Sequence, residues 1–485
     1  MTPSELEIGL RNLVSKFPGL DLTPNTFLQI VKPTDELLEP YSKYFLAGGP
    51  NILISRLLFL PRIILNILKS ILISLARVSE IKSWNAHQVH PKESLYISHF
   101  THAQRPEADD VFFGELLDRT SSNVFYLNST RINHQGLVTF YPKETRNNLF
   151  FMTKSLNVAT VIFTHMKFFT ISLKLFRHSF NNSLSKSDKW LLIEAGVRQH
   201  SRPTMANKFF ENRICDVIQK TRPKIVHFTF EGHAHEAVLI NLILSNFREI
   251  TLAPYQHAPI VPEQFGLMRN INRLGTKDRI FTSGNITRDY FKSFRSDIPI
   301  TAIGSSKYKE SALTSNLGTH VKVLGASEGT IQSLEAFIKL FSSLTHYHQN
   351  IEFKLRVHPA ISEREMGLAL KNAGGTKEVI SRNSLVEDLS TSTYCVYRSS
   401  AVAIEGLAYG VTPLFFDQSR SQGLNPLYFA NLHLPAFGSS DELIDFFADV
   451  ANLDVIHQGI DRVQLKQISE GYFSKVTGGF LKISE

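Results

Sequence analysis

The sequence predicts an α/β protein with two doubly wound parallel sheets and a helical extension before the first sheet. Between residues 91 and 440, short stretches rich in β-branched and aromatic residues alternate with helical patterns, which is typical of parallel sheets. Many of these strands end in polar segments, at the edge where parallel sheets bind ligands. A stretch rich in Ser, Lys, Thr, Asn and Gly near 305–320 divides the pattern into units at 91–305 and 320–440.

The composition limits the classes to which the protein can belong. Its 485 residues are 43% hydrophobic, which is enough for two or three globular domains. Only two cysteines occur, Cys215 and Cys395, which excludes a disulfide framework and favours a reducing compartment. Residues 1–21 lack the pattern of a secretion signal, so we expect a cytoplasmic protein.

The charge balance points to a class of partner. There are 52 basic against 44 acidic residues, and the pI of about 9.2 suits an anionic substrate or an anionic membrane surface. The sequence has no Lys/Arg-rich tract, zinc-finger spacing or aromatic RNA-binding signature. We therefore expect no nucleic-acid partner.

Residues 1–90 are predicted to form a helical lead-in with an amphipathic segment at 51–78. This segment is rich in Leu and Ile, but basic residues interrupt it, so no run reaches the ~18 uncharged residues of a spanning helix. On a helical wheel its polar residues fill an arc of roughly 140°, and most Leu and Ile take the remainder. The pattern predicts a helix in a membrane interface, divided near Pro61. The alternative is that the apolar face packs on the protein's own core.

In the first unit, short apolar stretches predict a series of strands with helices between them. The strands are expected at 94–100, 123–127, 224–230, 251–253, 279–282 and 300–303. The helical segments are expected from about Asp109–Asp110, at 150–185 as an insertion, at 187–220 as one long helix, and at 237–244.

The second unit repeats this alternation and is followed by a helical tail at 441–485. Its strands are expected at 321–324, 353–357, 393–397 and 413–416. Its helices are expected at 331–344, 362–373 and 385–390, with a further one after Ser400.

The stretch from Arg398 to Pro413 predicts a phosphate site. Ser399 or Ser400 is expected to cap a helix that Gly410 ends in a left-handed conformation. The unpaired N–H groups and partial positive charge of a helix N-terminus bind phosphate, and Arg398 lies beside them in the sequence. Glu405, one to two turns into the helix, is placed to reach ribose hydroxyls. The alternative is that the serines only cap the helix and Glu405 is a solvated helix residue.

Three short motifs, each at the carboxyl end of a predicted strand, resemble those of one enzyme family. They are Glu231–Gly232, His358–Pro359 and Ser399–Ser400, and Phe230 stands where the family often has another acid. In this order they resemble the motifs of bacterial sialyltransferases and of related Kdo and capsule transferases, which use CMP-activated sugars in capsule or lipopolysaccharide biosynthesis. The resemblance covers about residues 90–440 and implies the GT-B architecture, in which two Rossmann-like domains face each other.

Glycosyl transfer from a nucleotide sugar requires a base for the acceptor hydroxyl and a group that neutralises the departing phosphate. Glu231 is the candidate base; the alternative is that it caps the following helix. His358 is the candidate donor of a hydrogen bond or proton to the phosphate; the alternative is a structural histidine. The loop from Ser327 to Thr330 is expected to border the base or phosphate of the nucleotide.

A cluster of titratable residues follows Glu231. We expect His233, Glu236 and His257 to contact the acceptor or the sugar, with core or surface roles as the alternative. His233 and His235 are two residues apart and do not share a helix face as HExxH histidines do, so we expect no metal and no cofactor.

These observations lead to one functional expectation and three alternatives. The resemblance implies an inverting glycosyltransferase that transfers an acidic sugar, sialic-acid-like or Kdo, from a CMP donor to a cell-surface glycan precursor. We expect it to be peripheral on the inner face of the cytoplasmic membrane, bound through 51–78. The alternatives are a UDP-sugar 2-epimerase, a CDP-polyol phosphotransferase of the same architecture, and a non-catalytic subunit of a polysaccharide assembly complex.

Overall fold

The computed structural model describes most of the chain. The described residues are 2–17, 20, 22–34, 38–44, 51–76, 91–100, 110–117, 122–127, 148–152, 158–308, 321–348, 351–359, 361–418, 422–430, 432, 434–452 and 462–476. Most of the predicted linker at 305–320, the end of the amphipathic segment at 77–78, and parts of the predicted tail at 441–485 lie outside the described residues.

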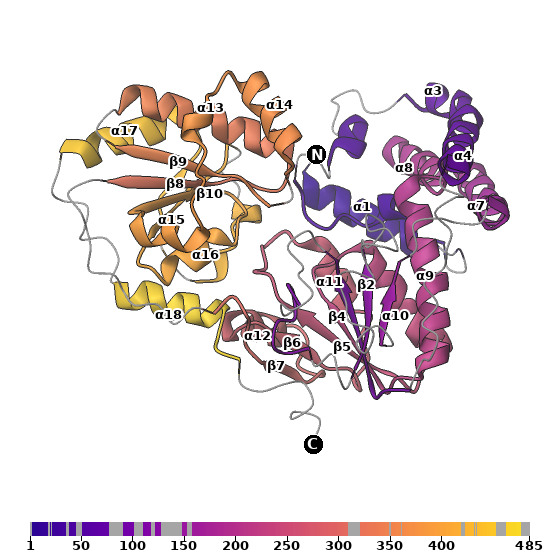
Figure 1. The fold of residues 1–485 in the computed structure, drawn as a ribbon. Helices are drawn as coiled ribbons and strands as arrows, with labels where there is room; N and C mark the ends of the chain where they lie inside the picture. Colours follow the sequence, from indigo (N-terminus) through magenta and orange to yellow (C-terminus); the bar gives the residue numbers. More distant parts are fainter. Residues whose placement is uncertain are drawn as a thin grey trace.

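The first unit is built on a seven-stranded parallel sheet, with strand order β3-β2-β1-β4-β5-β6-β7 (Figure 1). The chain runs outward from β1 to β3 and then returns to add β4 on the other side of β1, so the order reverses between β1 and β4. Ligands of doubly wound sheets bind at this kind of switch point. The strands are β1 Ser94–His99, β2 Asn123–Leu127, β3 Leu149–Phe151, β4 Ile225–Thr229, β5 Thr251–Gln256, β6 Ile280–Thr282 and β7 Ile300–Ala302.

Helices cover this sheet because its central strands are apolar on both faces. One core cluster joins the strands to α9 Arg202–Thr221, α10 Ala234–Asn246 and α11 Phe265–Ile271. A smaller cluster on Tyr96, Tyr255 and Phe281 lies under the segment from Asp110 to Leu117. α12 Asn285–Lys292 packs beside β6 and β7.

Two predicted helices of the first unit were wrong in detail. The expected helix at 187–220 is two helices, α8 Lys186–Arg198 and α9, because the chain turns at Ser201 and Pro203 begins a new first turn. The residues from Asp110 to Leu117 form turns and not a helix. The Asp110 carboxylate accepts hydrogen bonds from Ser98 Oγ and from the backbone N–H groups of Phe112 and Phe113, which holds the chain in this turn.

The second unit has a five-stranded parallel sheet with strand order β12-β11-β10-β8-β9. The order in which strands are added reverses between β8 and β10, and all the strands remain parallel. The strands are β8 Lys322–Ala326, β9 Glu352–Arg356, β10 Tyr394–Tyr397, β11 Thr412–Phe416 and β12 Ala436–Phe437. The helices are α13 Ile331–Tyr347, α14 Glu363–Ala373, α15 Leu385–Thr391, α16 Val402–Leu407 and α17 Ser440–Asn452. A core of Leu, Ile and Phe side chains fills the space between this sheet, α13 and α17.

The stretch from Arg398 to Pro413 forms the predicted strand, loop, helix and strand, with one correction. Gly410 has the predicted left-handed φ of +76°, although α16 already ends at Leu407 and Gly410 lies in the turn that follows. However, Ala401 occupies the N-cap position of α16, and neither Ser399 nor Ser400 does. The Ser400 hydroxyl still accepts a hydrogen bond from the backbone N–H of Val402, at 3.4 Å.

The N-terminal residues form a helical layer on the first unit. It comprises α1 Pro3–Ser15, the short 3-10 helices Thr26–Leu28 and Glu39–Tyr44, α3 Ile52–Leu57 and α4 Phe59–Ala76, which lie with α7 Val158–His178 and α8. The predicted division of 51–78 is confirmed, but it falls at Leu58, and Pro61 lies in the first turn of α4, where a proline is tolerated.

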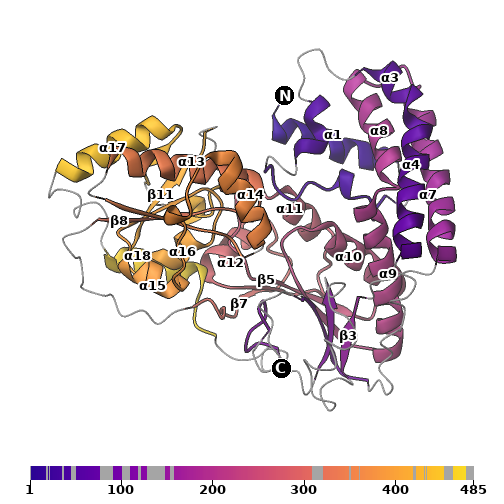
Figure 2. The ribbon, with the colours of Figure 1, turned by 45° about the horizontal axis from the view of Figure 1, so that its top comes forward.

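The end of the chain returns from the second unit to the first. α18 Arg462–Tyr472 contacts α16 in the second unit and α12 in the first (Figure 2). Behind it, Ser283 Oγ donates to the backbone carbonyl of Tyr472 at 2.9 Å, and Ser305 N–H donates to that of Ser474 at 3.0 Å. The predicted fold class is therefore confirmed, with two doubly wound α/β units in the GT-B arrangement and a helical extension at the N-terminus.

Candidate functional site

Five titratable residues gather at the switch point of the first sheet. His99 ends β1, Glu231 follows β4, and His257 follows β5, while His233 and His235 lie at the start of α10. Parallel pairing brings the carboxyl ends of β1, β4 and β5 to one edge of the sheet, so residues separated by about 160 positions meet there. We call these residues the Glu231 cluster.

Glu231 is the centre of this cluster. Its Oε1 lies 2.8 Å from His257 Nε2, and its Oε2 lies 3.7 Å from His233 Nε2. Burial acts to raise the pKa of Glu231, but the charges and hydrogen bonds of His257 and His233 outweigh it and lower this pKa well below its ordinary value. The carboxyl group is thus ionised at neutral pH. Because 31% of the side chain remains exposed, a ligand can reach it.

The two histidines differ in access. The His257 side chain is only 7% exposed, whereas that of His233 is 42% exposed and faces solvent. Burial acts to lower the pKa of His233, but its hydrogen bond to Glu231 and the negative charges of Glu231 and Glu236 raise it overall. His233 and Glu231 are therefore more accessible to a ligand than His257.

His99 and His235 complete the cluster as neutral rings. Burial, reinforced by the charge of His233, lowers the pKa of His99 to about 4, and burial lowers that of His235 well below its ordinary value. The His235 ring stacks on His233 with centroids 5.4 Å apart and meets His99 edge-on at 5.3 Å. These neutral rings limit the positive charge around Glu231.

Glu236 fixes the loop that carries Glu231. Its buried carboxylate accepts hydrogen bonds from the backbone N–H groups of Glu231 and Gly232, both at 2.8 Å, and one from Asn270 Nδ2 at 3.3 Å. The side chain of Gln264 donates to the Glu231 carbonyl at 2.8 Å. Glu236 was expected to contact the acceptor or sugar, and its hydrogen bonds lie within the protein, under the loop.

Gly232 is required by the same loop. Its φ is +92°, and a Cβ added there would lie 2.1 Å from the backbone nitrogen of Leu267. A residue with a side chain would be strained at this φ, and its Cβ would clash with the Leu267 backbone. The glycine therefore brings Glu231 directly against α11.

In the second unit, His358 follows β9 and lies beside the loop after β8. The ring is close to Gly329, since a Cβ on that glycine would lie 3.0 Å from His358 Nδ1. The surrounding protein partly desolvates the exposed ring, and this desolvation, together with the positive charges of Lys307 and Lys32, lowers its pKa. His358 is therefore neutral at pH 7 and has one ring N–H to donate.

The loop after β8 lies beside His358. Ser327 is buried, and its hydroxyl lies 3.4 Å from the Arg356 carbonyl. Thr330 caps α13 by accepting a hydrogen bond from the backbone N–H of Ser333 at 3.2 Å. The N-terminus of this 17-residue helix thus begins at the switch point of the second sheet.

Arg398 and the serines follow β10 at the same edge. Arg398 Nε lies 3.3 Å from Asp417 and 3.9 Å from Glu328, so two carboxylates surround its charge. Ser399 and Ser400 are half-buried beside it, and Glu405 lies half-buried one turn into α16. Arg356 points elsewhere, because its guanidinium binds the buried carboxylate of Asp388 at 3.1 Å.

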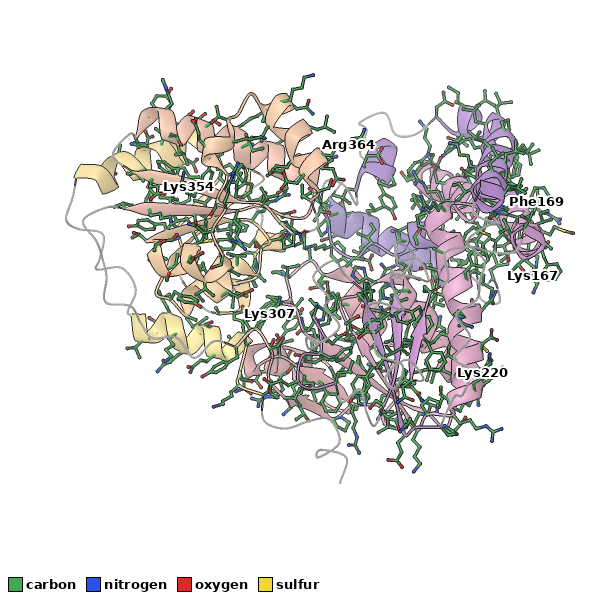
Figure 3. The ribbon with its side chains drawn as sticks, in the orientation of Figure 1. Lys167, Phe169, Lys220, Lys307, Lys354 and Arg364 are labelled. Atoms are coloured by element: carbon green, nitrogen blue, oxygen red, sulfur yellow. The ribbon has the colours of Figure 1, made fainter. Side chains whose placement is uncertain are left out.

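Lys32 and Lys307 connect the two halves electrostatically. The positive charge of Lys32 acts to lower the pKa of His233 in the first unit, where the negative charges outweigh it, and that of His358 in the second, so Lys32 is within electrostatic reach of both. Lys307 follows β7 and also acts on His358, and Figure 3 shows it between the two units. Arg269 anchors the segment before Lys32 by donating to the carbonyls of Leu28 and Ile30.

A direct contact also closes the two units on each other. The backbone N–H of Glu263, in the loop after β5, donates to the carbonyl of Gly423 at 3.0 Å. The pKa of Glu263 is raised, mainly by burial. The hydrogen bond from the Ser4 hydroxyl acts to lower this pKa, and the negative charge of Asp417, in the second unit, acts to raise it. This contact and the electrostatic reach of Lys32 therefore bring the carboxyl-end loops of the two sheets toward each other.

The sequence analysis missed several of these residues. Lys32, Lys307 and Asp417 stand in no motif, and only the fold brings them to the site. Glu328 lies inside the predicted loop from Ser327 to Thr330 but was not singled out. Asp417 had one signal, since it directly follows the predicted strand at 413–416. Among the residues that the structure describes, no group of three or more His, Cys, Asp or Glu side chains is arranged to hold a metal ion.

Comparisons with known proteins reveal similarity in structure only. No protein-family model matches the sequence, and a search of curated proteins gives no significant match. A glycosyltransferase of kitacinnamycin superposes with a TM-score of 0.45 at 12% identity, over 81% of this chain and 97% of that one. The glycosyltransferase SnogD from Streptomyces nogalater superposes with a TM-score of 0.40 at 11% sequence identity, over 79% of this chain and 96% of that one. A UDP-GlcNAc 2-epimerase from Methanocaldococcus jannaschii superposes with a TM-score of 0.40 at 9% sequence identity, over 77% of this chain and 98% of that one. Similarities this distant assign no function.

Proposed function

We propose that this protein is an inverting glycosyltransferase that transfers an acidic sugar, sialic-acid-like or Kdo, from a CMP-activated donor to a cell-surface glycan precursor. The observation that carries the proposal is the pairing of two sites across one space. An ionised, accessible Glu231 lies at the switch point of one sheet, and a neutral His358 lies beside the switch point of the other. Inversion requires this separation, because the base and the leaving group stand on opposite sides of the anomeric carbon.

Glu231 and His358 act on opposite sides of the anomeric carbon in the proposed reaction. The acceptor hydroxyl oxygen forms a bond to the anomeric carbon while the bond from that carbon to the CMP phosphate oxygen breaks. Glu231 takes the hydroxyl proton, and the electron pair of the broken bond leaves with CMP. His358 donates its N–H to the departing phosphate, with the loop at Ser399–Ser400 and the N-terminus of α13 beside it.

The charges at the interface support an acidic donor sugar. Lys32 and Lys307 lie on the first unit's side of His358, and a sialic-acid-like sugar or Kdo carries a carboxylate that either ammonium group can bind. Arg398 is already surrounded by carboxylates, so the two lysines supply positive charge that the second unit does not. Glu405 is proposed to bind the ribose.

Thermal stabilisation by nucleotides tests the proposal. CMP, CDP, UDP, GDP and ADP are each added to wild type and to His358→Ala, with His346→Ala as the control, an exposed histidine near the far end of α13. A ligand at ~100 times its Kd adds about 2.7 kcal/mol of stability. We expect CMP alone to stabilise wild type and His346→Ala, and His358→Ala to lose the effect. Stabilisation by UDP or CDP alone would favour the epimerase or polyol phosphotransferase, and no binding by any nucleotide would favour a non-catalytic subunit.

Activity then tests the base. Glu231→Gln keeps the size of the side chain but cannot accept the proton, and we expect transfer to fall by about 10²–10⁴-fold. Glu249→Gln is the matched control, because Glu249 is exposed at the opposite, amino-terminal edge of β5. Equal activity of Glu231→Gln and wild type would remove Glu231 from the mechanism.

We also propose that the protein is peripheral on the inner face of the cytoplasmic membrane and binds it through 51–78. The support is the row of exposed Leu and Ile side chains on α3 and α4. Fractionation of cells that express the chain tests this location. Recovery with the membranes, followed by release in alkaline carbonate, is expected for a peripheral protein, and recovery in the soluble fraction alone would refute it.

A further inference from the structure

The outer surface of α3, α4 and α7 is apolar, and it combines segments about 100 residues apart in the sequence. α4 packs beside α7, and the views in Figures 1 and 2 show them side by side at the end of the molecule away from the second unit. We call the exposed apolar side chains of these helices the α4–α7 face. They are Leu53, Ile54, Leu57, Leu58, Leu60, Ile64, Leu65, Leu68, Leu72, Ile73, Leu75, Ile162, Phe163, Met166 and Leu173.

The polar side of α3 and α4 faces the protein. This is the reverse of an ordinary surface helix, whose apolar side faces the core and whose polar side faces water. Arg62 forms an ion pair with the buried carboxylate of Glu194, and Asn66 Nδ2 donates to the Val197 carbonyl at 3.3 Å. Ser55 and Ser74 are buried. Most of the polar arc predicted from the helical wheel is therefore used inside the protein. Most of the Leu and Ile side chains are left outside, while Phe59 and Ile63 are buried. A contiguous exposed apolar surface of this kind marks an interaction site.

α7 belongs to the folded body and still contributes to this face. By length and composition it is the one helix among the described residues that is apolar enough to cross a membrane. However, Phe168 and Leu175 on its inner side are buried, and Ser172 Oγ donates to the Gly196 carbonyl of α8 at 2.7 Å. A helix packed in this way along its length is suited to lie on a bilayer.

The charged residues of α3, α4 and α7 are of one sign. The residues of α3, α4 and α7 include six Lys or Arg and no Asp or Glu. Lys69, Lys167, Lys174 and Arg177 are exposed, and Figure 3 shows Lys167 at the outer edge of this layer. The Glu194 carboxylate beneath α4 is buried and paired with Arg62. An apolar surface bordered by cations matches a bilayer that contains anionic lipid.

We propose that the α4–α7 face, with α7 as an essential half, docks the protein flat on a bilayer through insertion of its apolar side chains and attraction of its lysines to anionic headgroups. This deepens the peripheral location proposed above, which named only 51–78. It also restricts the glycan acceptor to molecules that are anchored in the same bilayer. Docking does not depend on the identity of the sugar donor.

Vesicle flotation tests the docking. The full chain is mixed with vesicles of phosphatidylcholine alone and of phosphatidylcholine with phosphatidylglycerol. Leu68→Asp in α4 and Met166→Asp in α7 are compared with Leu368→Asp, an exposed leucine on α14 in the second unit. We expect each variant on the face to bind anionic vesicles about tenfold more weakly or worse, and Leu368→Asp to bind like wild type.

A charge variant tests the lipid class without changing the apolar side chains. Lys69→Glu combined with Lys167→Glu is expected to remove the preference for phosphatidylglycerol, and added salt is expected to weaken wild-type binding. Unchanged binding by Met166→Asp would overturn the role of α7. The proposal would be overturned if the protein bound neither kind of vesicle and if sedimentation velocity showed wild-type dimers that Leu68→Asp abolishes. The face would then be assigned to contact with a second copy of the chain. Nucleotide stabilisation, measured on the same variants, is expected to stay unchanged, which separates failure of docking from failure of the proposed enzyme.

Discussion

Replacement of His257 by leucine tests whether the Glu231 cluster sets the pKa of the proposed base. The change removes the donor that lies 2.8 Å from Glu231 Oε1 and leaves a side chain of similar volume in a buried position. A hydrogen bond to a charged group contributes about 1.5–3 kcal/mol. At 1.36 kcal/mol per pKa unit, and with partial exposure of Glu231 screening the interaction, we expect its pKa to rise by about one unit.

The assay is the pH dependence of kcat/KM for sugar transfer. Glu231 must be ionised to accept a proton, so activity is lost as the pH falls through its pKa. A higher pKa moves this acid limb to higher pH in His257→Leu, and His257→Gln, which keeps a donor, is expected to move it less. His233→Leu is the internal comparison, because His233 lies 3.7 Å from the carboxylate and is expected to have a smaller effect.

A stability measurement gives a second readout that needs no substrate. A carboxyl group with a lowered pKa in the folded state stabilises the protein above its unfolded pKa, and this stability is lost as the pH falls through the folded value. Urea unfolding of wild type is therefore expected to lose this contribution in the acid range, and His257→Leu is expected to have less of it to lose. An acid limb that stays in place in His257→Leu, or that moves further in His233→Leu, would refute the reasoning.

The remaining predictions concern the loop, the helical layer and the phosphate site. Gly232→Ala imposes a side chain at a φ of +92° and against the Leu267 backbone, so urea unfolding is expected to show a loss of about 1–3 kcal/mol or more in the free energy of unfolding. The control is Gly367→Ala, because Gly367 lies inside α14 with open space where a Cβ would stand. This variant is expected to stabilise the protein by about 0.5–1 kcal/mol. Arg62→Leu leaves the buried Glu194 carboxylate without its closest partner, and a loss of about 2 kcal/mol is expected in the same assay, whereas unchanged stability would show that Arg198, 3.7 Å away, suffices. Because the pKa of His358 is lowered, its neutral form binds the nucleotide at pH 7 and above, and CMP affinity measured by calorimetry is expected to show a pH dependence only at lower pH, which disappears in His358→Asn. A dependence that persists in that variant would exclude His358 as its source.

Much of the fold follows from local patterns in the sequence. The strands before Glu231 and Ser399 are short, largely apolar and rich in β-branched or aromatic residues. The strand before His358 instead alternates buried Phe353 and Leu355 with charged residues, and each of the three was predicted within a few residues of its bounds. Parallel strands align their carboxyl ends, so the residues that follow them were expected to share an edge. This reasoning covers the positions of Glu231, His257, His358 and Ser327 at strand ends. Gly410 has the predicted left-handed conformation, but it lies in the turn after α16, which ends at Leu407.

The tertiary structure decided the direction of side chains and the meeting of distant segments. A helical wheel separates the polar and apolar sides of 51–76, but it does not say which side faces the protein, and the ion pair of Arg62 with Glu194 places the polar side inward. Arg356 is two residues before His358, so alternation along an extended strand would put both on one face, but the buried carboxylate of Asp388 binds the Arg356 guanidinium. The position of Lys32 near both His233 and His358 depends on docking of the N-terminal segment through Arg269, a contact across 241 residues to Leu28. Such contacts depend on how the elements pack together, and short-range patterns of apolar and polar residues do not encode that packing.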